Sequence, residues 1–168
     1  AIPVLNQLVS QLATARDQAR FRERFQRLQK EHEAQRAEWK RWATVKAGQR
    51  PMSAEWLAHC IGEEVDEDTI IIDETVTNWP TVARHVHRSQ PGTIFRTGGS
   101  SLGWGLGCAL GAKLGTPQKT VICLTGDGGF LFGHPTAALW AASNYRAPFL
   151  TIIWDNGGYY AVKQILTE

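Results

Sequence analysis

The sequence has few cysteines, little net charge and no long hydrophobic run. Its three cysteines, Cys60, Cys108 and Cys123, lack the spacing of a zinc site, and their odd number and apolar neighbours favour buried, reduced thiols. The net charge of +2 gives no general reason to expect a nucleic-acid or membrane partner. No apolar run approaches the length of a membrane span, and no basic segment precedes an apolar signal core. We therefore expect a soluble protein of the cytoplasm, with an organelle as the open alternative.

Basic residues are concentrated near the N-terminus. Residues 16–41 contain nine Lys or Arg against five Asp or Glu, and Phe21, Phe25 and Leu28 recur on one face of a predicted helix. Two roles fit such a helix, a nucleic-acid-binding arm and a charged, solvated connector between domains. The interspersed acidic residues favour the connector.

The first 48 residues are predicted to be a helical linker and the end of a preceding domain. Residues 2–4 are typical of the end of a strand, and Gly48 to Pro51 interrupts the helical pattern. We place a domain boundary there, so that residues 49–168 form a second domain. Because the sequence starts without Met and stops within a predicted helix, we expect a piece of a longer protein, with this second domain incomplete at its C-terminus.

Short apolar segments alternate with helical patterns in residues 49–168. Residues 69–72, 120–125 and 149–154 have the length and composition of buried strands. Residues 136–145 are rich in Ala and suit a helix packed on a sheet. This alternation predicts an α/β fold in which a parallel sheet carries helices on both faces.

Polar turns follow two of the predicted strands. Asp127 follows the strand at 120–125 and Asn156 follows the strand at 149–154, so both lie at the carboxyl edge of a parallel sheet, where ligands bind. Gly126, Gly128 and Gly129 allow the backbone to approach an anion closely. A carboxylate, a side-chain amide and a backbone carbonyl are oxygen ligands suited to Mg²⁺. We predict a site for a magnesium-bound diphosphate.

The spacing of these turns resembles the signature of thiamine-diphosphate-dependent enzymes. In that signature Gly-Asp-Gly, here residues 126–128, is followed after 26 residues by a pair that is Asp155-Asn156 in this sequence. The lead-in from Leu110-Gly111 through Pro117 also resembles the family pattern. Asp155 is a mild departure, since many members have Asn there. The resemblance implies the thiamine-diphosphate-binding fold for residues 49–168, with thiamine diphosphate and Mg²⁺ as cofactors.

The resemblance also implies roles for individual residues. Asp127, the Asn156 side chain and the Gly158 carbonyl would be the metal ligands. Leu102, which lies 25 residues before Asp127, would be the aliphatic wedge that keeps the two rings of the cofactor folded together. The remaining cofactor-binding residues implied are Val76, Thr77, Ser100, Gly126, Gly128, Gly129 and Tyr159. Ser100 would contribute its carbonyl, and Val76 only its amide because it has no hydroxyl.

In this family a glutamate from a separate pyrimidine-binding domain, usually of a second subunit, activates the cofactor. Glu74 lies on the wrong turn for that role, so the catalytic glutamate is expected outside these 168 residues. The resemblance therefore implies a homodimeric or homotetrameric full-length protein and a segment that is inactive alone. Its glycine-rich segment most resembles the branch with acetolactate synthase and benzoylformate decarboxylase. Acetolactate synthases usually carry Met at the position of Leu102, so Leu102 favours a 2-oxo acid decarboxylase. Such an enzyme is a lyase or transferase, and carboligation to a second carbonyl compound is the related activity.

Parts of the sequence suggest three alternative functions: a serine hydrolase, a dinucleotide-binding module and a non-catalytic subunit. Gly99 to Gly103 fits a nucleophile elbow with Ser101 as nucleophile, but a serine hydrolase would then need Asp127 and His134, only seven residues apart, in its triad. His134 also suits proton transfer, although an exposed residue before a helix is the favoured interpretation. The glycine-rich segment does not meet the dinucleotide-binding spacing. A non-catalytic subunit that retains the fold stays open, with the intact Asp127 and Asn156 against it.

Overall fold

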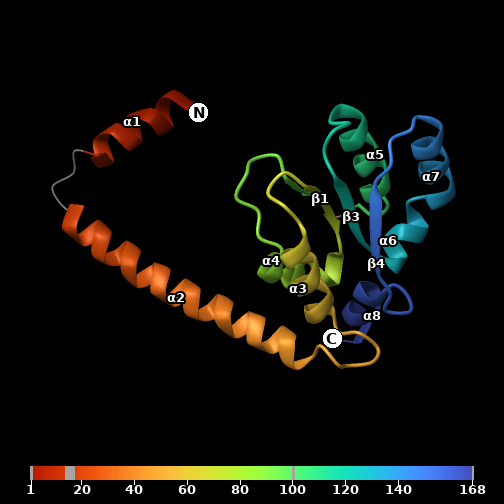
Figure 1. Ribbon diagram of the computed structural model, residues 1–168, viewed down its shortest axis with the longest axis horizontal. Coiled ribbons are helices and arrows are strands. Elements are labelled where there is room, and N and C mark those ends of the chain that lie inside the picture. Colours follow the sequence, from red (N-terminus) through yellow and green to blue (C-terminus); the bar gives the residue numbers. More distant parts are fainter. Residues whose placement is uncertain (1, 14–17, 100, 168) are drawn as a thin grey trace. The chain divides into compact units, whose positions relative to one another are not determined.

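The computed structural model describes residues 2–13, 18–99 and 101–167. The chain divides into two compact units, residues 1–41 and residues 42–168. Figure 1 labels the helices and strands of both. Among the described helices, none combines the length and the apolar character needed to cross a bilayer.

The first unit is helical throughout its described residues. Helix α1 covers Ile2–Ala13, so the expectation that residues 2–4 end a strand is wrong: these residues continue the helical pattern of Leu5, Leu8 and Leu12. Helix α2, Gln18–Val45, confirms the predicted charged helix over residues 18–41 and extends beyond it; residues 16 and 17 lie outside the described residues. An Arg27–Glu31 pair at 2.9 Å is an ordinary exposed i,i+4 interaction.

The second unit alternates helices and strands along the chain (Figure 1). Its elements are α3 Ala54–Glu64, β1 Ile70–Glu74, η1 Val76–Asn78, α4 Trp79–His85, β2 Ile94–Arg96, α5 Gly105–Gly115, β3 Val121–Gly126, α6 Asp127–Phe132, α7 Pro135–Asn144, β4 Leu150–Trp154 and α8 Tyr160–Thr167. Ser53 caps α3 by accepting a hydrogen bond from the Trp56 N–H.

The four strands form one parallel sheet in the order β2-β1-β3-β4. From β1 the chain first adds β2 on one side and then places β3 and β4 on the other. The order therefore reverses between β1 and β3, and their carboxyl ends are neighbours, with Glu74 paired to Thr125. In open parallel sheets this reversal is where ligands bind.

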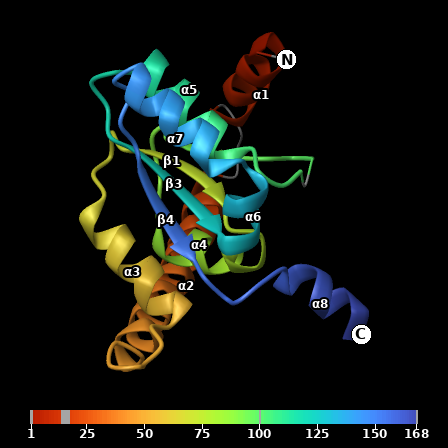
Figure 2. The same cartoon turned by 90° about the vertical axis from the view of Figure 1, so that its right-hand side faces the viewer.

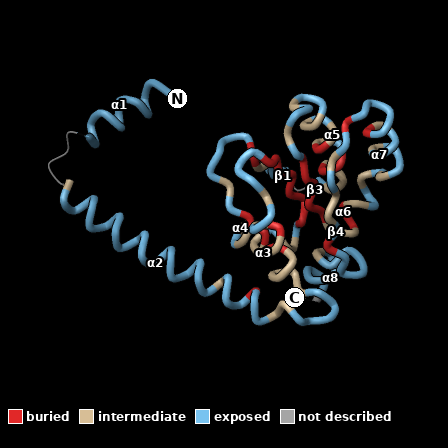
Figure 3. Tube along the Cα trace, in the orientation of Figure 1, coloured by how far each residue is buried: buried red, intermediate tan, exposed pale blue. Residues whose placement is uncertain are grey.

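Side chains of the central strands alternate between two apolar layers. Ile71, Ile122 and Leu124 pack with α3 and α4, whereas Ile72 and Cys123 pack with α5. Figure 2 shows these helices on opposite faces of the sheet, and Figure 3 shows the buried residues concentrated along β1 and β3. The α/β fold with a parallel sheet between helices, as predicted, is confirmed.

Two boundaries differ from the sequence-based prediction in ways that affect the site. Strand β1 continues through Asp73 and Glu74, which were predicted to lie in a polar turn. Both carboxyl groups are buried and satisfied by neighbouring donors, so the strand tolerates them. Helix α5 begins at Gly105, so Leu102 belongs to the preceding turn rather than to the helix.

Candidate functional site

The predicted site residues come together around one cavity at the carboxyl ends of β1 and β3. Its lining includes every predicted site residue that the structure describes: Val76, Thr77, Leu102, Gly126, Asp127, Gly128, Gly129, Asn156, Gly158 and Tyr159. Ser100 lies outside the described residues. The structure thus shows that these residues are neighbours, while their roles toward a ligand stay predictions.

The turns after β3 and β4 are joined by a hydrogen bond. The Gly158 N–H donates to Oδ2 of Asp127 over 2.7 Å, and the Gly158 carbonyl accepts from the Tyr160 N–H over 2.9 Å. Gly157 and Gly158 have φ values of +80° and +147°, which explains glycine at both positions. In this conformation the Gly158 N–H, rather than its carbonyl, faces Asp127.

Two glycines after β3 allow other side chains to approach the backbone. A Cβ added to Gly129 would lie 2.9 Å from Thr125 Oγ1 and 3.3 Å from Glu74 Cδ, and one added to Gly128 would lie 2.9 Å from the Tyr159 ring. Tyr159, which lies against Gly128, is part of the lining of this cavity, which measures about 60 Å³. It is therefore smaller than the volume of about 300–1,000 Å³ that is usual for a pocket holding a whole ligand.

The turn after β1 contains a strained residue. Val76 has φ of +42°, a region that a β-branched residue rarely adopts, and its side chain is 46% exposed. Such backbone outliers concentrate at functional sites. Asp73 braces this turn, since its Oδ1 accepts hydrogen bonds from the Thr75 N–H and hydroxyl, and its Oδ2 pairs with Arg96 at 2.8 Å.

Glu74 is the only acidic residue among the described lining residues that the sequence-based prediction missed; Thr75, Tyr160, Ala161 and Val162 also line the cavity and were not predicted. Glu74 is only 4% exposed, and its carboxylate accepts hydrogen bonds from the backbone N–H groups of Gly103 and Gly105. The feature of the sequence that could have indicated Glu74 is its position as an acidic residue after an apolar strand segment, because a buried acid needs specific partners. The sequence does not show which residues those partners are.

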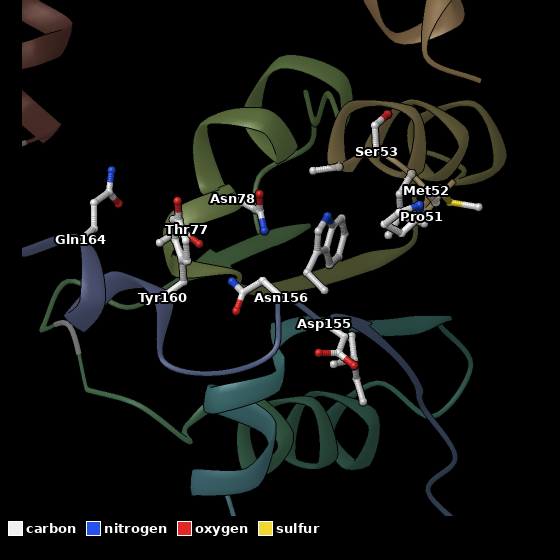
Figure 4. Close-up of a pocket in the computed structure, with 13 residues that line it drawn as sticks. Pro51, Met52, Ser53, Thr77, Asn78, Asp155, Asn156, Tyr160 and Gln164 are labelled. Carbon is white, nitrogen blue, oxygen red and sulfur yellow. The ribbon is translucent and has the colours of Figure 1, made fainter. Parts of the chain in front are cut away.

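A larger pocket, which is the one shown in Figure 4, adjoins this cavity. It measures about 590 Å³, and Thr77, Asn156 and Tyr160 line both spaces. Figure 4 shows polar side chains from η1, the turn after β4 and α8 around it. The described residues that line this pocket include no Lys, Arg or His, so it offers amide and hydroxyl groups and the Asp155 carboxylate, without positive charge.

The donor set around the small cavity fits a magnesium diphosphate. Two carboxylates line the cavity: Glu74 is bound by backbone N–H groups, whereas Asp127 shares the lining with the Asn156 amide and the backbone of Gly158. Among the described residues no group of three or more His, Cys, Asp or Glu side chains could hold a metal. Mg²⁺ commonly uses one or two carboxylates and completes its shell with water and phosphate oxygens, so this sparse oxygen set is sufficient.

Cys123 lies behind the site in the α5 layer of the core. Burial, with a smaller contribution from the nearby Glu74 charge, raises the pKa of the Cys123 thiol to about 12. Burial also raises the pKa of the Cys108 thiol. These shifts oppose the thiolate form and agree with the predicted role of Cys123 as a buried, reduced core residue.

The shifted pKa of Cys123 predicts a loss of stability at alkaline pH. Between about pH 9 and about 12 the unfolded thiol loses its proton while the folded thiol keeps it, so the unfolded state binds fewer protons. The free energy of unfolding should then fall by up to about 1.4 kcal/mol per pH unit in this window. Urea denaturation at several pH values would measure the slope. It should be shallower in Cys123→Ala than in the parent or in Cys60→Ala, and three parallel profiles would contradict the prediction.

The alternative triad receives no support from the geometry. Ser101 is exposed, as is His134, and no hydrogen bond among the described residues joins them. His134 occupies the left-handed position before α7, with φ of +50°, so the interpretation as an exposed residue preceding the helix is confirmed.

Comparison with known proteins identifies the family. The model of the thiamine pyrophosphate enzyme C-terminal TPP binding domain matches residues 75–168. A benzoylformate decarboxylase of Pseudomonas aeruginosa is 34% identical over 113 residues, which cover 67% of this chain and 21% of that protein. A protein of Methanococcus aeolicus named probable acetolactate synthase large subunit is 32% identical, over 55% of this chain and 15% of its own length.

Solved structures agree with this assignment. The thiamine diphosphate-dependent 4-hydroxybenzoylformate decarboxylase of Rhodococcus jostii RHA1 matches with a TM-score of 0.64 and 29% identity, over 69% of this chain and 22% of that one. The benzoylformate decarboxylase of Polynucleobacter necessarius matches in fold with a TM-score of 0.62 and 20% identity, over 71% of this chain and 23% of that one. The chain thus spans about a fifth of the length of these relatives. It belongs to the thiamine pyrophosphate enzyme family, and residues 75–168 match that family's C-terminal cofactor-binding domain.

Proposed function

We propose that this chain is the thiamine-diphosphate- and Mg²⁺-binding part of a 2-oxo acid decarboxylase with carboligase activity, a lyase or transferase. The observation that carries this proposal is the cavity at the β1–β3 reversal, which collects the glycine turn, Asn156 and Leu102 in one place. The names of the relatives, benzoylformate decarboxylase and probable acetolactate synthase, support the class of reaction.

The residues of this chain would bind and orient the cofactor. Asp127 and Asn156 would hold the metal through their side-chain oxygens, with the Gly158 carbonyl as third ligand. The backbone N–H groups of Gly128 and Gly129 would face the diphosphate. When bound, thiamine diphosphate supplies a carbon nucleophile and an electron sink for decarboxylation. Leu102 would support its folded conformation.

Binding requires a rearrangement of the turn after β4. The Gly158 N–H already occupies Asp127 Oδ2, and the Tyr159 ring rests on Gly128. Metal coordination would replace the first contact, and the diphosphate would displace the second. Gly157 and Gly158 can absorb the backbone change because both already use conformations that other residues avoid.

The rest of the active site would come from outside this chain. The activating glutamate would lie on a pyrimidine-binding domain, in a homodimer or homotetramer, and this segment alone would be inactive. Helices α6 and α7 expose four large apolar side chains, Leu131, Phe132, Leu139 and Trp140. Their exposure supports the inference that another part of the protein covers this surface.

Calorimetric titration of thiamine diphosphate into the full-length protein tests the proposal. Binding heat is expected with Mg²⁺ and is expected to vanish with a chelator, because the cation neutralises the repulsion between the diphosphate and Asp127. Absence of heat with both cofactors present would contradict the proposal. Binding without turnover of any 2-oxo acid would instead support the non-catalytic subunit.

Leu102→Ala should separate cofactor binding from cofactor activation. Leu102 lines the cavity, so its truncation removes the wedge while Asp127 and Asn156 keep the metal diphosphate. We expect bound cofactor with proton exchange at the thiazolium C2 slowed about tenfold, which corresponds to about 1.4 kcal/mol. Proton exchange followed by NMR in deuterated water measures it. Leu114→Ala, an exposed position on α5 outside the cavity, should exchange at the parent rate, and an unchanged rate in Leu102→Ala would contradict the wedge role.

A further inference from the structure

Glu74 is an acid in the lining of the small cavity at the carboxyl ends of β1 and β3, and the proposed binding roles do not use it. It is the last residue of β1, is 4% exposed and takes part in no ion pair among the described residues. Its neighbour Asp73 differs, because Arg96 pairs with it and Thr75 donates to it. A buried carboxylate without a cation needs hydrogen-bond donors, and here those donors come from the backbone.

Both carboxylate oxygens of Glu74 bind the segment that carries Leu102. Oε1 accepts from the Gly103 N–H, and Oε2 accepts from the Gly105 N–H over 2.9 Å. These amides follow Leu102 directly, at the point where the chain turns into α5. The carboxylate therefore fixes the backbone that presents Leu102 to the cavity.

Two glycines enclose the carboxylate from different elements. A Cβ on Gly105 would lie 2.5 Å from Glu74 Oε2, and a Cβ on Gly129 would lie 3.3 Å from Glu74 Cδ. Gly105 begins α5, whereas Gly129 belongs to the first turn of α6, which also carries Asp127. Glu74 thus contacts both the segment expected to support the cofactor ring system and the turn expected to bind its diphosphate.

The far side of the Leu102 turn is also fixed by backbone contact. Gly103 has φ of +85°, and a Cβ there would lie 2.8 Å from Gly133 Cα, after α6. The turn is therefore held between Glu74 on one side and Gly133 on the other. Removing one of these two supports leaves Leu102 attached to a segment that is free to shift.

We propose that Glu74 is a positioning residue. It fixes Leu102 relative to the glycines at the start of α6, residues 126–129, so that the cofactor is bound in its folded, reactive conformation. The inference rests on the proposed function, since it assigns Glu74 a task only if thiamine diphosphate occupies this cavity. Glu74 acts through the Gly103 and Gly105 amides.

Glu74→Gln tests the inference with a nearly isosteric change. The amide side chain places an NH₂ group against one of the two backbone N–H donors, so one hydrogen bond is lost. In the full-length protein we expect C2 proton exchange of the bound cofactor to slow about tenfold, and kcat to fall by the same factor, while the Mg²⁺ dependence of binding is retained. Glu74→Asp keeps the charge but shortens the side chain by one methylene, and it should show the same defect because it cannot reach both amides.

Ile72→Val is the matched control. Ile72 lies on the same strand, packs in the α5 layer and does not line the cavity, so this variant lowers stability without touching the Leu102 turn. Its exchange rate should match the parent. Parent-like exchange in both Glu74 variants would overturn the inference, as would equal slowing in Ile72→Val. Failure of the parent itself to bind thiamine diphosphate would instead overturn the proposed function. Should Glu74→Gln fail to fold, Glu74→Asp decides by the same exchange rate.

Discussion

Asp127→Ala is expected to abolish the Mg²⁺-dependent binding of thiamine diphosphate while leaving the sheet folded. Asp127 is the acidic residue in the first turn of α6, and it reaches the turn after β4 through its bond with the Gly158 N–H. Without it, the cation would lose the charged ligand proposed above, and α6 would lose its connection to the turn after β4. We expect the dissociation constant measured with Mg²⁺ to rise at least about 100-fold, or about 2.7 kcal/mol.

Asp127→Ala is expected to lose both the affinity for thiamine diphosphate and the dependence of that affinity on Mg²⁺. Removing Asp127 also removes a negative charge that would repel the diphosphate, so binding without Mg²⁺ should not weaken, while added Mg²⁺ should no longer strengthen it. Titrations of the full-length variant with Mg²⁺ and with a chelator should therefore coincide. Asp155→Ala is a suitable control, since Asp155 lies beside Asn156 but, among the described residues, accepts a hydrogen bond only within its own turn, from the Gly157 N–H at 3.0 Å. An Asp127→Ala protein that still binds more tightly with Mg²⁺ would exclude Asp127 as a metal ligand.

The sequence was sufficient to predict the layers and the edge of the sheet at which the site lies. Strand periodicity and the polar turns at Asp127 and Asn156 are local features, and a parallel β3–β4 pair brings both turns to one edge. The relation between β1 and β3 is different, because strand order depends on how the whole sheet packs. Sequence alone therefore gave no reason to place Glu74 opposite Thr125, beside the glycine turn.

The remaining errors arise from contacts between segments distant in the chain. The start of α5 is one example, since Gly103 adopts φ of +85° and the helix begins only at Gly105, after Leu102. Glycine permits that conformation without requiring it, so the turn was not predictable from the sequence. The contact of Tyr159 with Gly128 likewise depends on how the turn after β4 folds back.

Gly62→Ala is expected to be the most destabilising single-methyl addition among the helical glycines of the second unit. Gly62 lies in α3 where that helix crosses α4, and an added Cβ would overlap the carbonyl oxygen of His85 and lie 2.9 Å from its carbonyl carbon. Because these are backbone atoms, relief requires the two helices to separate. Overpacking of this kind costs about 1–3 kcal/mol and occasionally more, and we expect the upper end. Urea denaturation measures the free energy of unfolding directly.

Gly111→Ala in α5 provides the opposite expectation from the same chemical change. Nothing lies within 4 Å of its added Cβ, so the variant should gain up to about 1 kcal/mol from helix propensity alone. The opposite signs expected for the change in free energy of unfolding separate the effect of helix packing from that of helix propensity. A stabilised Gly62→Ala would show that α3 and α4 do not pack this closely. Since α4 follows directly from the turn at Val76 and Thr77, separating α3 from α4 should also weaken cofactor binding. That second effect would connect the packing of this helical layer to the position of the proposed diphosphate site.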